Sequence, residues 1–306
     1  MDFLKKLKSN PYHILSPILM SGLLNGLPDE PYLKLMYRAQ MGTKLDLDDP
    51  KTLNEKLQWL KLHDRNPDYP LMVDKYEAKK YIGERIGEEY IIPTLGVWER
   101  FDDIDFDALP DRFVLKCTHD SGGLVVVRDK SKLDIDAARA KINKSLKNNY
   151  YYMGREWPYK SVKPQILAEQ YMEDETGELV DYKFYCFNGA VDCVLGCFDR
   201  ASGDTKFYFF DRDWNLKRYN KRGKAAPEGF TKPKPASMDR MFEVAEKLGG
   251  IVGAPFLRVD LYSVYDRIYF GEITLYPSSG FDLGRLPETD LMFGQRVDLS
   301  RTKRYD

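Results

Sequence analysis

Apolar residues in the N-terminal part of the chain recur at the spacing of helices. The run from Leu53 to Leu60 carries an apolar face, and Thr52 stands directly before it as a candidate N-cap. A second helical pattern extends from about Tyr69 to Ile86. We therefore predict that residues 1–65 are mainly helical and that another helix follows them.

After the second helical pattern, the spacing changes to the short apolar runs that are typical of strands. Residues 90–98, 113–117 and 124–127 form three such runs, and a glycine-containing loop separates the last two. These two runs and their loop predict a hairpin. A helix is predicted at 135–148, and an aromatic-rich segment without a clean period follows at 150–159.

The remainder of the chain is predicted to consist mainly of strands. The pair Asn188-Gly189 lies between two apolar runs and is the strongest hairpin signal, because both residues tolerate the positive φ angles of a tight turn. Residues 215–236 are basic and rich in proline and glycine, so we expect a long loop there, and Ser237 is a candidate cap for a helix through Leu248. Strands are predicted at residues 166–172, 181–187, 190–198, 207–210, 256–262 and 267–273.

Length and composition are those of an ordinary soluble, globular protein. The 306 residues are enough for two or three packed lobes, and 43% of them are hydrophobic while 31% are charged. The formal net charge of −1 gives no global reason to expect nucleic acid or an anionic membrane as a partner.

The cysteines and histidines limit the metal and redox chemistry that the chain can offer. Cys117, Cys186, Cys193 and Cys197 show no paired CxxC spacing and are interpreted as buried thiols of a reducing compartment, so we expect a cytoplasmic protein. A metal or redox role for these thiols is the less favoured alternative. Because the chain has only three histidines, any bound metal should be a hard cation with oxygen ligands, such as Mg²⁺.

The N-terminus resembles a secretion signal only superficially. Lys5, Lys6 and Lys8 precede an apolar stretch from Tyr12 to Leu27. A proline and an asparagine break this stretch, no small-residue cleavage site is evident, and the stretch is too short to span a bilayer. We expect a helical extension that packs on the body of the protein, and a loose contact with a membrane surface is the alternative.

A lysine at the end of an apolar strand is the first candidate for chemistry. Lys116 follows three apolar residues, and an ammonium group there is costly to desolvate unless an anion lies against it. The loop after it, residues 118–123, offers small residues and free backbone N–H groups that suit a phosphate. The alternative interpretation is a hairpin turn beside a lysine whose ammonium group reaches solvent.

A second group of charged residues lies on the last two predicted strands. Alternation places Arg258, Asp260 and Tyr262 on one face, and it places Glu272 and Thr274 on one face of the neighbouring strand. Two facing carboxylates repel each other unless a cation lies between them, so this pattern favours a magnesium site. The alternative is an ion pair between Arg258 and Glu272 on a solvated sheet.

Seven short motifs follow one another in a characteristic order. They are Asp74-Lys75-Tyr76, Phe113-Val114-Leu115-Lys116, Ser121-Gly122-Gly123, Leu167-Ala168-Glu169, Asp181-Tyr182-Lys183-Phe184, Arg258-Val259-Asp260 and Gly271-Glu272-Ile273-Thr274. This order, over about residues 70–285, resembles the ATP-grasp superfamily, specifically its TupA-like (teichuronopeptide biosynthesis) branch. The resemblance implies an α+β ATP-grasp fold in which two lobes enclose the nucleotide. It also implies a helical N-terminal extension at 1–68, a first lobe with a phosphate lid at 69–165, and a second lobe with a metal site at 166–306.

The resemblance implies which residues bind ATP. The implied ligands are Lys75 and Lys116 for the phosphates, Ser121, Gly122 and Gly123 as a flexible lid over them, Glu169 with the backbone through Met172 for the adenine amino group, and Asp181 near the ribose.

The resemblance also implies catalytic and metal-binding residues. Lys183 would face the transferred phosphate, and Arg258 would stabilise the phosphoryl or tetrahedral intermediate. Asp260 and Glu272 would bridge Mg²⁺ ions, and Thr274 stands at the second metal site where many ATP-grasp enzymes have asparagine. The proline of this motif is followed by two serines before the glycine at position 280, so the loop departs from the family pattern.

In the ATP-grasp superfamily a carboxylate attacks the γ-phosphate of ATP, and an amine then converts the acylphosphate into an amide. The resemblance therefore implies an ATP-dependent carboxylate–amine ligase that uses ATP and Mg²⁺. The TupA-like branch further implies the biosynthesis of a bacterial surface or capsular polysaccharide. The amine would come from an amino acid or amino sugar, and the acid would be a uronic acid or a similar acid. A glycan or sugar nucleotide is a candidate partner, and Tyr150–Tyr159 and Lys217–Arg222 are candidates for binding it, with simple packing as the equal alternative.

Two other functions remain as alternatives at this stage. A glycosyltransferase that uses a sugar nucleotide could also hold a metal on Asp260 and Glu272, but it has no evident use for two phosphate-directed lysines and a hinge glutamate. A non-catalytic nucleotide-binding or scaffold protein is the other alternative, and the intact phosphate and metal residues argue against it.

Overall fold

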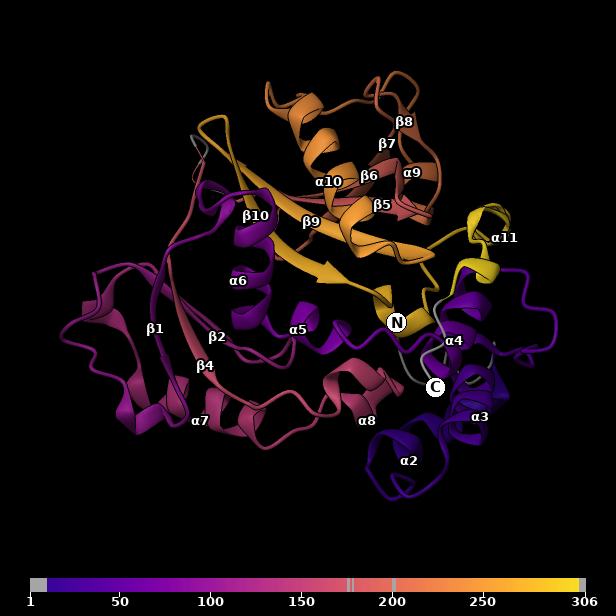
Figure 1. Cartoon of the computed structure of the whole chain (residues 1–306), viewed down its shortest axis with the longest axis horizontal. Helices are drawn as coiled ribbons and strands as arrows, with labels where there is room; N and C mark the ends of the chain where they lie inside the picture. The colour runs from indigo at the N-terminus through magenta and orange to yellow at the C-terminus, as the bar shows by residue number, and fades with distance from the viewer. Residues whose placement is uncertain (1–9, 175–176, 178, 200–201, 303–306) are drawn as a thin grey trace.

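The computed structural model describes residues 10–174, 177, 179–199 and 202–302 of the chain. Two antiparallel sheets and their helices form two α+β lobes, and a group of N-terminal helices packs beside them (Figure 1). The predicted fold class is therefore confirmed. None of the described helices is long and apolar enough to cross a bilayer.

Helices dominate the N-terminal region, as predicted. The extension contains η1 (Pro11–Leu15), α2 (Ser16–Met20) and α3 (Asp29–Met41). The following helix, α4 (Leu53–His63), begins at a capping box. In this box the Thr52 hydroxyl accepts a hydrogen bond from the backbone N–H of Glu55, and the Glu55 carboxylate accepts one from the backbone N–H of Thr52.

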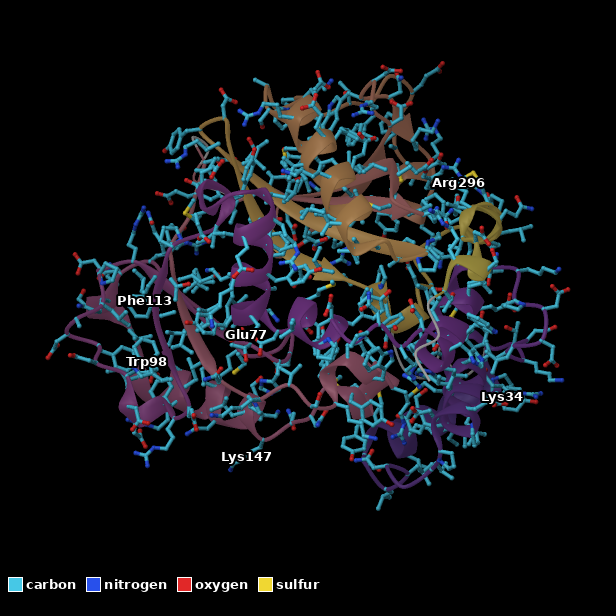
Figure 2. All side chains as sticks on the ribbon, viewed as in Figure 1. Lys34, Glu77, Trp98, Phe113, Lys147 and Arg296 are labelled. Carbon is cyan, nitrogen blue, oxygen red and sulfur yellow. The ribbon has the colours of Figure 1, made fainter. Side chains whose placement is uncertain are left out.

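The helix predicted between residues 69 and 86 is in fact two helices, α5 (Tyr69–Val73) and α6 (Lys75–Ile86). Asp74 adopts an extended conformation between them, and its carboxylate accepts hydrogen bonds from the N–H groups of Tyr76 and Glu77. Asp74 is therefore the residue at which α5 ends and the N-cap at which α6 begins. In Figure 1, α6 lies between the two sheets, and Figure 2 labels Glu77 on this helix.

The first lobe contains a four-stranded sheet in the order β1-β4-β2-β3. Its strands are β1 (Thr94–Trp98), β2 (Phe113–Cys117), β3 (Leu124–Val127) and β4 (Ile166–Gln170), and β2 and β3 form the predicted hairpin. The strand predicted from residue 90 starts later, because η2 (Glu88–Tyr90) precedes it. Helix α7 (Ile135–Leu146) packs on the sheet through Ile142, which lies in one apolar core with Phe113. Figure 2 labels Phe113 on the first lobe.

The second lobe contains a six-stranded sheet in the order β10-β9-β5-β6-β7-β8. The predicted turn between β5 and β6 is present, with φ angles of 52° at Asn188 and 91° at Gly189. Helix α10 (Met238–Val252) covers one face of the sheet, where the rings of Phe184 and Phe242 lie 5.1 Å apart. The strands are β5 (Asp181–Phe187), β6 (Ala190–Phe198), β7 (Lys206–Phe210), β8 (Leu216–Lys217), β9 (Phe256–Val264) and β10 (Arg267–Thr274).

Two predictions about the basic segment need correction. Residues 215–236 are not one continuous loop, because they contain β8 and the short helix α9 (Lys221–Lys224). The Ser237 side chain does not cap α10, since its hydroxyl pairs with the Ser263 hydroxyl at 2.7 Å. The remaining elements are η3 (Phe101–Asp103), η4 (Lys130–Lys132), α8 (Tyr151–Gly154), η5 (Trp157–Tyr159), η7 (Pro277–Gly280), α11 (Pro287–Arg296) and η8 (Leu299–Arg301).

Candidate active site

Three neighbouring strands of the second lobe bring the C-terminal charged residues together. Lys183 on β5 pairs with Asp260 on β9, and Asp260 pairs with Glu272 on β10. Arg258 and Thr274 pair with each other in the next row on the same face. The two carboxylates therefore face each other, as the strand alternation predicts.

This pairing depends on a β-bulge at Gly271. The register of the preceding residue pairs would place Glu272 opposite Val259, on the other face of the sheet. The extra residue shifts the register by one and brings Glu272 opposite Asp260. A Cβ atom at Gly271 would lie 3.0 Å from the carbonyl oxygen of Asp260 and 2.9 Å from the Tyr262 ring, so any larger residue at the bulge would force these neighbours to shift.

Two cations and three carboxylates form a buried network on this face, which we call the sheet cluster. The Lys183 ammonium donates to Asp181 at 2.5 Å and also to Asp260. Arg258 donates to both oxygens of Asp260, each at 2.6 Å, and to Glu272 at 3.1 Å. When all five groups are ionised, the sheet cluster carries one more negative charge than positive charge.

The environment affects the two facing carboxylates differently. Burial raises the pKa of Asp260, although the charges of Arg258 and Lys183 oppose this effect. Desolvation would also raise the pKa of Glu272, but the positive charges of Lys75, Arg258 and Lys183 lower it to about 2. The Asp260 side chain is 1% exposed and that of Glu272 is 39% exposed, so Glu272 is the ionised carboxylate that a ligand can reach.

The sheet cluster fits a magnesium ion. Proteins usually hold Mg²⁺ through one or two carboxylates, together with substrate phosphates and water. Glu272 supplies an accessible carboxylate, and the Thr274 hydroxyl lies 3.2 Å from it. Among the described residues, no group of three or more His, Cys, Asp or Glu side chains could hold a metal, so the remaining ligands of such an ion would come from the substrate and water.

In the first lobe, Lys116 belongs to a buried group that we call the lysine cluster. The Glu169 carboxylate lies between two ammonium groups, 2.5 Å from that of Lys116 and 2.6 Å from that of Lys79. Burial would raise the pKa of Glu169, but the two lysines lower it to about 2. Sequence analysis did not select Lys79, although its place on the buried face of α6 with Ala78 and Ile82 was a signal.

A cavity of about 450 Å³ extends from the lysine cluster to the second lobe. Lys116 and Glu169 contribute charged groups to its wall. Met172 also lines the cavity, and Tyr262 of β9 lines it from the second lobe. Because Tyr262 pairs with Asp181 on β5, the cavity adjoins the sheet cluster. A wall with apolar side chains and the charged groups of Lys116, Glu169 and Arg128 suits a flat aromatic base that carries an anionic tail. The apolar part of the wall includes Ile92, Val114, Leu124, Val126 and Leu179.

The predicted phosphate lid is the loop between β2 and β3. Ser121 and Gly122 are exposed, whereas Gly123 is buried and donates its N–H to the Asp120 carboxylate at 3.1 Å. A Cβ atom at Gly123 would lie 2.4 Å from a buried thiol, so only glycine fits there. The Lys75 ammonium donates to the carbonyl oxygen of Asp120, which places this lysine at the base of the loop.

A buried cluster that sequence analysis missed adjoins the sheet cluster. The Lys61 ammonium donates to the carbonyl oxygens of Gly154 at 2.6 Å and Ser279 at 2.7 Å. The Ser279 hydroxyl in turn donates to Glu156 at 2.7 Å. Burial lowers the pKa of Lys61 to about 7 and raises that of Glu156, and the charges of Arg258 and Glu272 also act on the Glu156 carboxyl.

The loop that carries Ser279 has an unusual backbone. Ser278, Ser279 and Gly280 all have left-handed conformations, with φ angles of 51°, 53° and 68°. Each serine in this conformation costs roughly 1–2 kcal/mol. The contacts of Lys61 therefore hold a strained loop directly after the candidate metal-binding residues of β10, and such strain is typical of functional sites.

The aromatic segment and the basic segment differ in their relation to the site. The Tyr150 and Tyr159 rings lie 4.9 Å apart, and burial, followed by the negative charges of Glu156 and Glu272, raises the pKa of Tyr159. This segment is therefore close to the sheet cluster. In the basic segment, Arg218 is held by carbonyl oxygens within its own loop, such as that of Ala226 at 2.7 Å.

His119, in the loop that follows β2, and the four cysteines do not line the cavity. His119 is buried, and its Nε2 atom lies 3.2 Å from the carbonyl oxygen of Ser145 and 3.1 Å from that of Asn148 at the end of α7. The four cysteines are buried free thiols. The three lysines of the N-terminal tail precede residue 10 and lie outside the described residues.

The chain matches the family described as TupA-like ATPgrasp over residues 55–298. Among solved structures, D-alanine–D-alanine ligase from Bacillus anthracis in complex with ATP is 15% identical, with a TM-score of 0.46 over 85% of this chain and 74% of that chain. D-alanine–D-alanine ligase from Helicobacter pylori is 17% identical, with a TM-score of 0.43 over 80% and 69%. Phosphoribosylamine–glycine ligase from Thermotoga maritima is 15% identical, with a TM-score of 0.41 over 74% and 52%. No curated protein matches the sequence significantly.

Proposed function

The chain belongs to the TupA-like ATP-grasp family, and from this premise we propose that it joins an acid to an amine during the biosynthesis of a bacterial surface polysaccharide. As an ATP-grasp ligase it forms carbon–nitrogen bonds with ATP and Mg²⁺. We propose a uronic acid or a similar acid as one substrate and an amino acid or amino sugar as the other. Because ATP is made in the cytoplasm and the cysteines are free thiols, we place the reaction there.

The observation that carries this proposal is the opposite charge of two clusters beside one cavity. In the lysine cluster two ammonium groups share one carboxylate. In the sheet cluster three carboxylates share two cations. A triphosphate with Mg²⁺ matches both, since the phosphates are anionic and the metal is a divalent cation.

ATP would lie with its adenine in the apolar cavity and its phosphates toward the second lobe. Lys116 lines that cavity, and Glu169 fixes the position of its ammonium group. Lys75 and the exposed N–H groups of Ser121 and Gly122 would close over the phosphates. Asp181, which pairs with Tyr262 of the cavity wall, would lie near the ribose.

In the first chemical step, a carboxylate oxygen of the acid attacks the γ-phosphorus. The bond from the γ-phosphorus to its bridging oxygen breaks, and ADP leaves with the electron pair. Lys183 and Arg258 face this region and would neutralise the charge that develops. Glu272, with the Thr274 hydroxyl, would hold Mg²⁺, which supplies further neutralisation of the phosphate charges, and Asp260, sealed behind Glu272, would position Arg258 and Lys183.

In the second step, the amine attacks the carbonyl carbon of the acylphosphate. The carbon–oxygen bond breaks, phosphate leaves, and the nitrogen loses a proton to give the amide. Arg258 would stabilise the oxyanion of the tetrahedral intermediate. Of the two segments suggested for sugar binding, Tyr150–Tyr159 has the better support, because it adjoins the sheet cluster while Arg218 is engaged within its own loop.

The experiment that tests this function is ADP release from ATP and Mg²⁺ with a panel of acids and amines. The acids should include uronic acids, and the amines should include amino acids and amino sugars. The expected product has the mass of the acid plus the amine minus one water. Stabilisation by a uridine-diphosphate sugar, with none by Mg-ATP in a thermal-shift measurement, would overturn the proposal in favour of a sugar-nucleotide enzyme.

A further inference from the structure

The described part of the N-terminal extension that precedes α3 carries exposed apolar side chains and no charged ones. Residues 9–28 contain no Asp, Glu, Lys or Arg, although 31% of the whole chain is charged. Charged side chains return on α3, which carries Lys34 (Figure 2). Four side chains of this stretch form what we call the docking surface. They are Ile14, Ile18, Met20 and Leu23, with exposed fractions of 57%, 47%, 57% and 81%.

The exposure of these side chains is a property of an ordered segment. Leu19, between two of them, is 2% exposed, and its carbonyl oxygen accepts a hydrogen bond from the Tyr32 hydroxyl at 3.1 Å. The turn after Leu23 is held by Arg155, whose guanidinium donates to the carbonyl oxygens of Leu24 and Asn25, each at 3.1 Å. The inner face of the segment is therefore fixed to the body, and the outer face is directed away from it.

The sequence next to the docking surface is basic. Lys5, Lys6 and Lys8 precede it, and Asp2 is the only acidic residue before Asp29. Apolar side chains that follow several lysines in the sequence suit the boundary of a bilayer that contains anionic lipids, because the side chains bury apolar area while lysines attract the headgroups.

We propose that the docking surface inserts into the headgroup region of an anionic lipid bilayer and holds the ligase at the membrane. A second copy of the chain fits this surface less well. A stable protein interface needs about 800 Å² from each partner, which four partly exposed side chains do not supply. The neighbouring lysines of two copies would also repel each other.

The docking surface is connected to the candidate active site through two consecutive residues. Arg155 binds the turn that follows Leu23, and Glu156 accepts the hydrogen bond from Ser279 in the strained loop. Figure 1 shows α8, which directly precedes these residues, beside α2 and α3. If the proposed function holds, an acceptor attached to the bilayer would reach the site from this side, whereas the docking itself does not depend on that function.

Cosedimentation of the full chain with lipid vesicles tests the proposal. We expect binding to vesicles of phosphatidylcholine with 30% phosphatidylglycerol, and weaker binding to pure phosphatidylcholine or at high salt. The double variant Ile18→Asp, Leu23→Asp should bind the anionic vesicles at least about tenfold more weakly. The matched control is Tyr265→Asp, because Tyr265 is 63% exposed at the distant β9–β10 turn and should not matter for binding.

The buried cysteines permit a second test that places the surface directly. All four native thiols are buried, and burial raises the pKa of Cys117 to about 11, so a cysteine introduced at an exposed site can be labelled selectively. A polarity-sensitive dye on Leu23→Cys should shift to the blue with anionic vesicles, while the same dye on Tyr265→Cys should not.

Three outcomes would overturn the proposal. They are no vesicle binding by the wild type, equal binding by the wild type and the double variant, and a wild-type dimer in sedimentation velocity that the double variant loses. ADP release with soluble substrates should be the same in the wild type and the double variant, so failure of the docking proposal leaves the proposed function untouched. A melting temperature of the double variant close to that of the wild type would show that it folds, as expected for exposed positions.

Discussion

The lysine cluster and the sheet cluster are both buried, but their charges are unbalanced in opposite directions. Two lysines surround Glu169 in the first lobe, while Asp181, Asp260 and Glu272 outnumber the two cations of the second. An unbalanced buried charge is costly in the absence of a partner. The sign of each excess therefore indicates the ligand, an anion for the first lobe and a cation for the second.

The two clusters also share an arrangement of accessible and buried charged groups. In each, one charged side chain reaches the solvent or the cavity and another is sealed behind it. Lys116 is 22% exposed and Lys79 is 8% exposed, while Glu272 is 39% exposed and Asp260 is 1% exposed. The comparison suggests that the accessible member contacts the ligand and that the sealed member positions it.

The largest effect is expected when the accessible carboxylate of the sheet cluster is neutralised, because this tests whether the negative excess of that cluster serves a metal ion. Glu272→Gln keeps the shape of the side chain but removes the charge that we assign to Mg²⁺. We expect ADP release to fall by at least about 10³-fold, because the phosphate charges would no longer be neutralised. Activity within tenfold of the wild type across a magnesium titration would contradict the assignment.

The next largest effect concerns stability and the lysine cluster. The pKa of Glu169 is lowered from 4.5 to about 2 in the folded state, so its charge stabilises the fold above pH 4.5, and this stabilisation is lost as the pH falls toward 2. At neutral pH the contribution is roughly 3 kcal/mol. Glu169→Gln should lose about this free energy of unfolding at pH 7 and should depend less steeply on pH below 4.5. Urea unfolding at several pH values measures both, and identical pH profiles would show that the cluster does not stabilise the fold.

A third prediction separates the accessible lysine from the sealed one. Lys116→Met should weaken ATP binding by roughly 30-fold, since a charge-assisted contact to phosphate is lost while Lys79 still neutralises Glu169. Lys79→Met removes a lysine that does not line the cavity, so it should lower the melting temperature more and the affinity for ATP less. Isothermal titration calorimetry with Mg-ATP compares the two. Equal losses of ATP affinity in the two variants would mean that the exposure of a lysine does not identify the lysine that binds ATP.

The smallest expected effect belongs to a buried group outside both clusters. Cys193 is 1% exposed in the core of the second lobe. Cys193→Ser should leave ADP release within about twofold of the wild type and lower stability by about 1 kcal/mol, because a hydroxyl is buried there in place of a thiol. A large loss of ADP release in a folded Cys193→Ser variant would mean that a residue other than the charged ones takes part in the reaction.

Much of the fold could be predicted because its signals are local. Each of β2, β5 and β9 is a single short stretch of mainly apolar residues, and the Asn188-Gly189 turn needs only two residues. The break at Asp74 was missed because an aspartate within a helical pattern reads as an exposed position. Only the extended backbone of that residue and its hydrogen bonds to the N–H groups of Tyr76 and Glu77 show that it is a cap.

The site residues on adjacent strands could be predicted from the sequence, whereas those that come together from distant segments could not. Arg258, Asp260 and Glu272 follow from alternation on adjacent strands, although the bulge that sets their register gives no signal beyond one glycine. Lys61 and Glu156 come from distant segments and both bond to Ser279 in the folded chain, so no local sequence pattern indicates that they lie together. Lys79 had a signal in its apolar neighbours, but its partner Glu169 lies 90 positions away.

The bulge at Gly271 has a consequence for genetics. A side chain at this position would press on the Asp260 carbonyl oxygen and the Tyr262 ring, so the strand pair that sets the position of Glu272 would have to shift. A random mutagenesis screen scored by loss of turnover would therefore collect changes at Gly271 as readily as changes at its acidic neighbour. Hits at this glycine would reveal the geometry of the strand pair, although the residue itself has no functional group to offer a substrate.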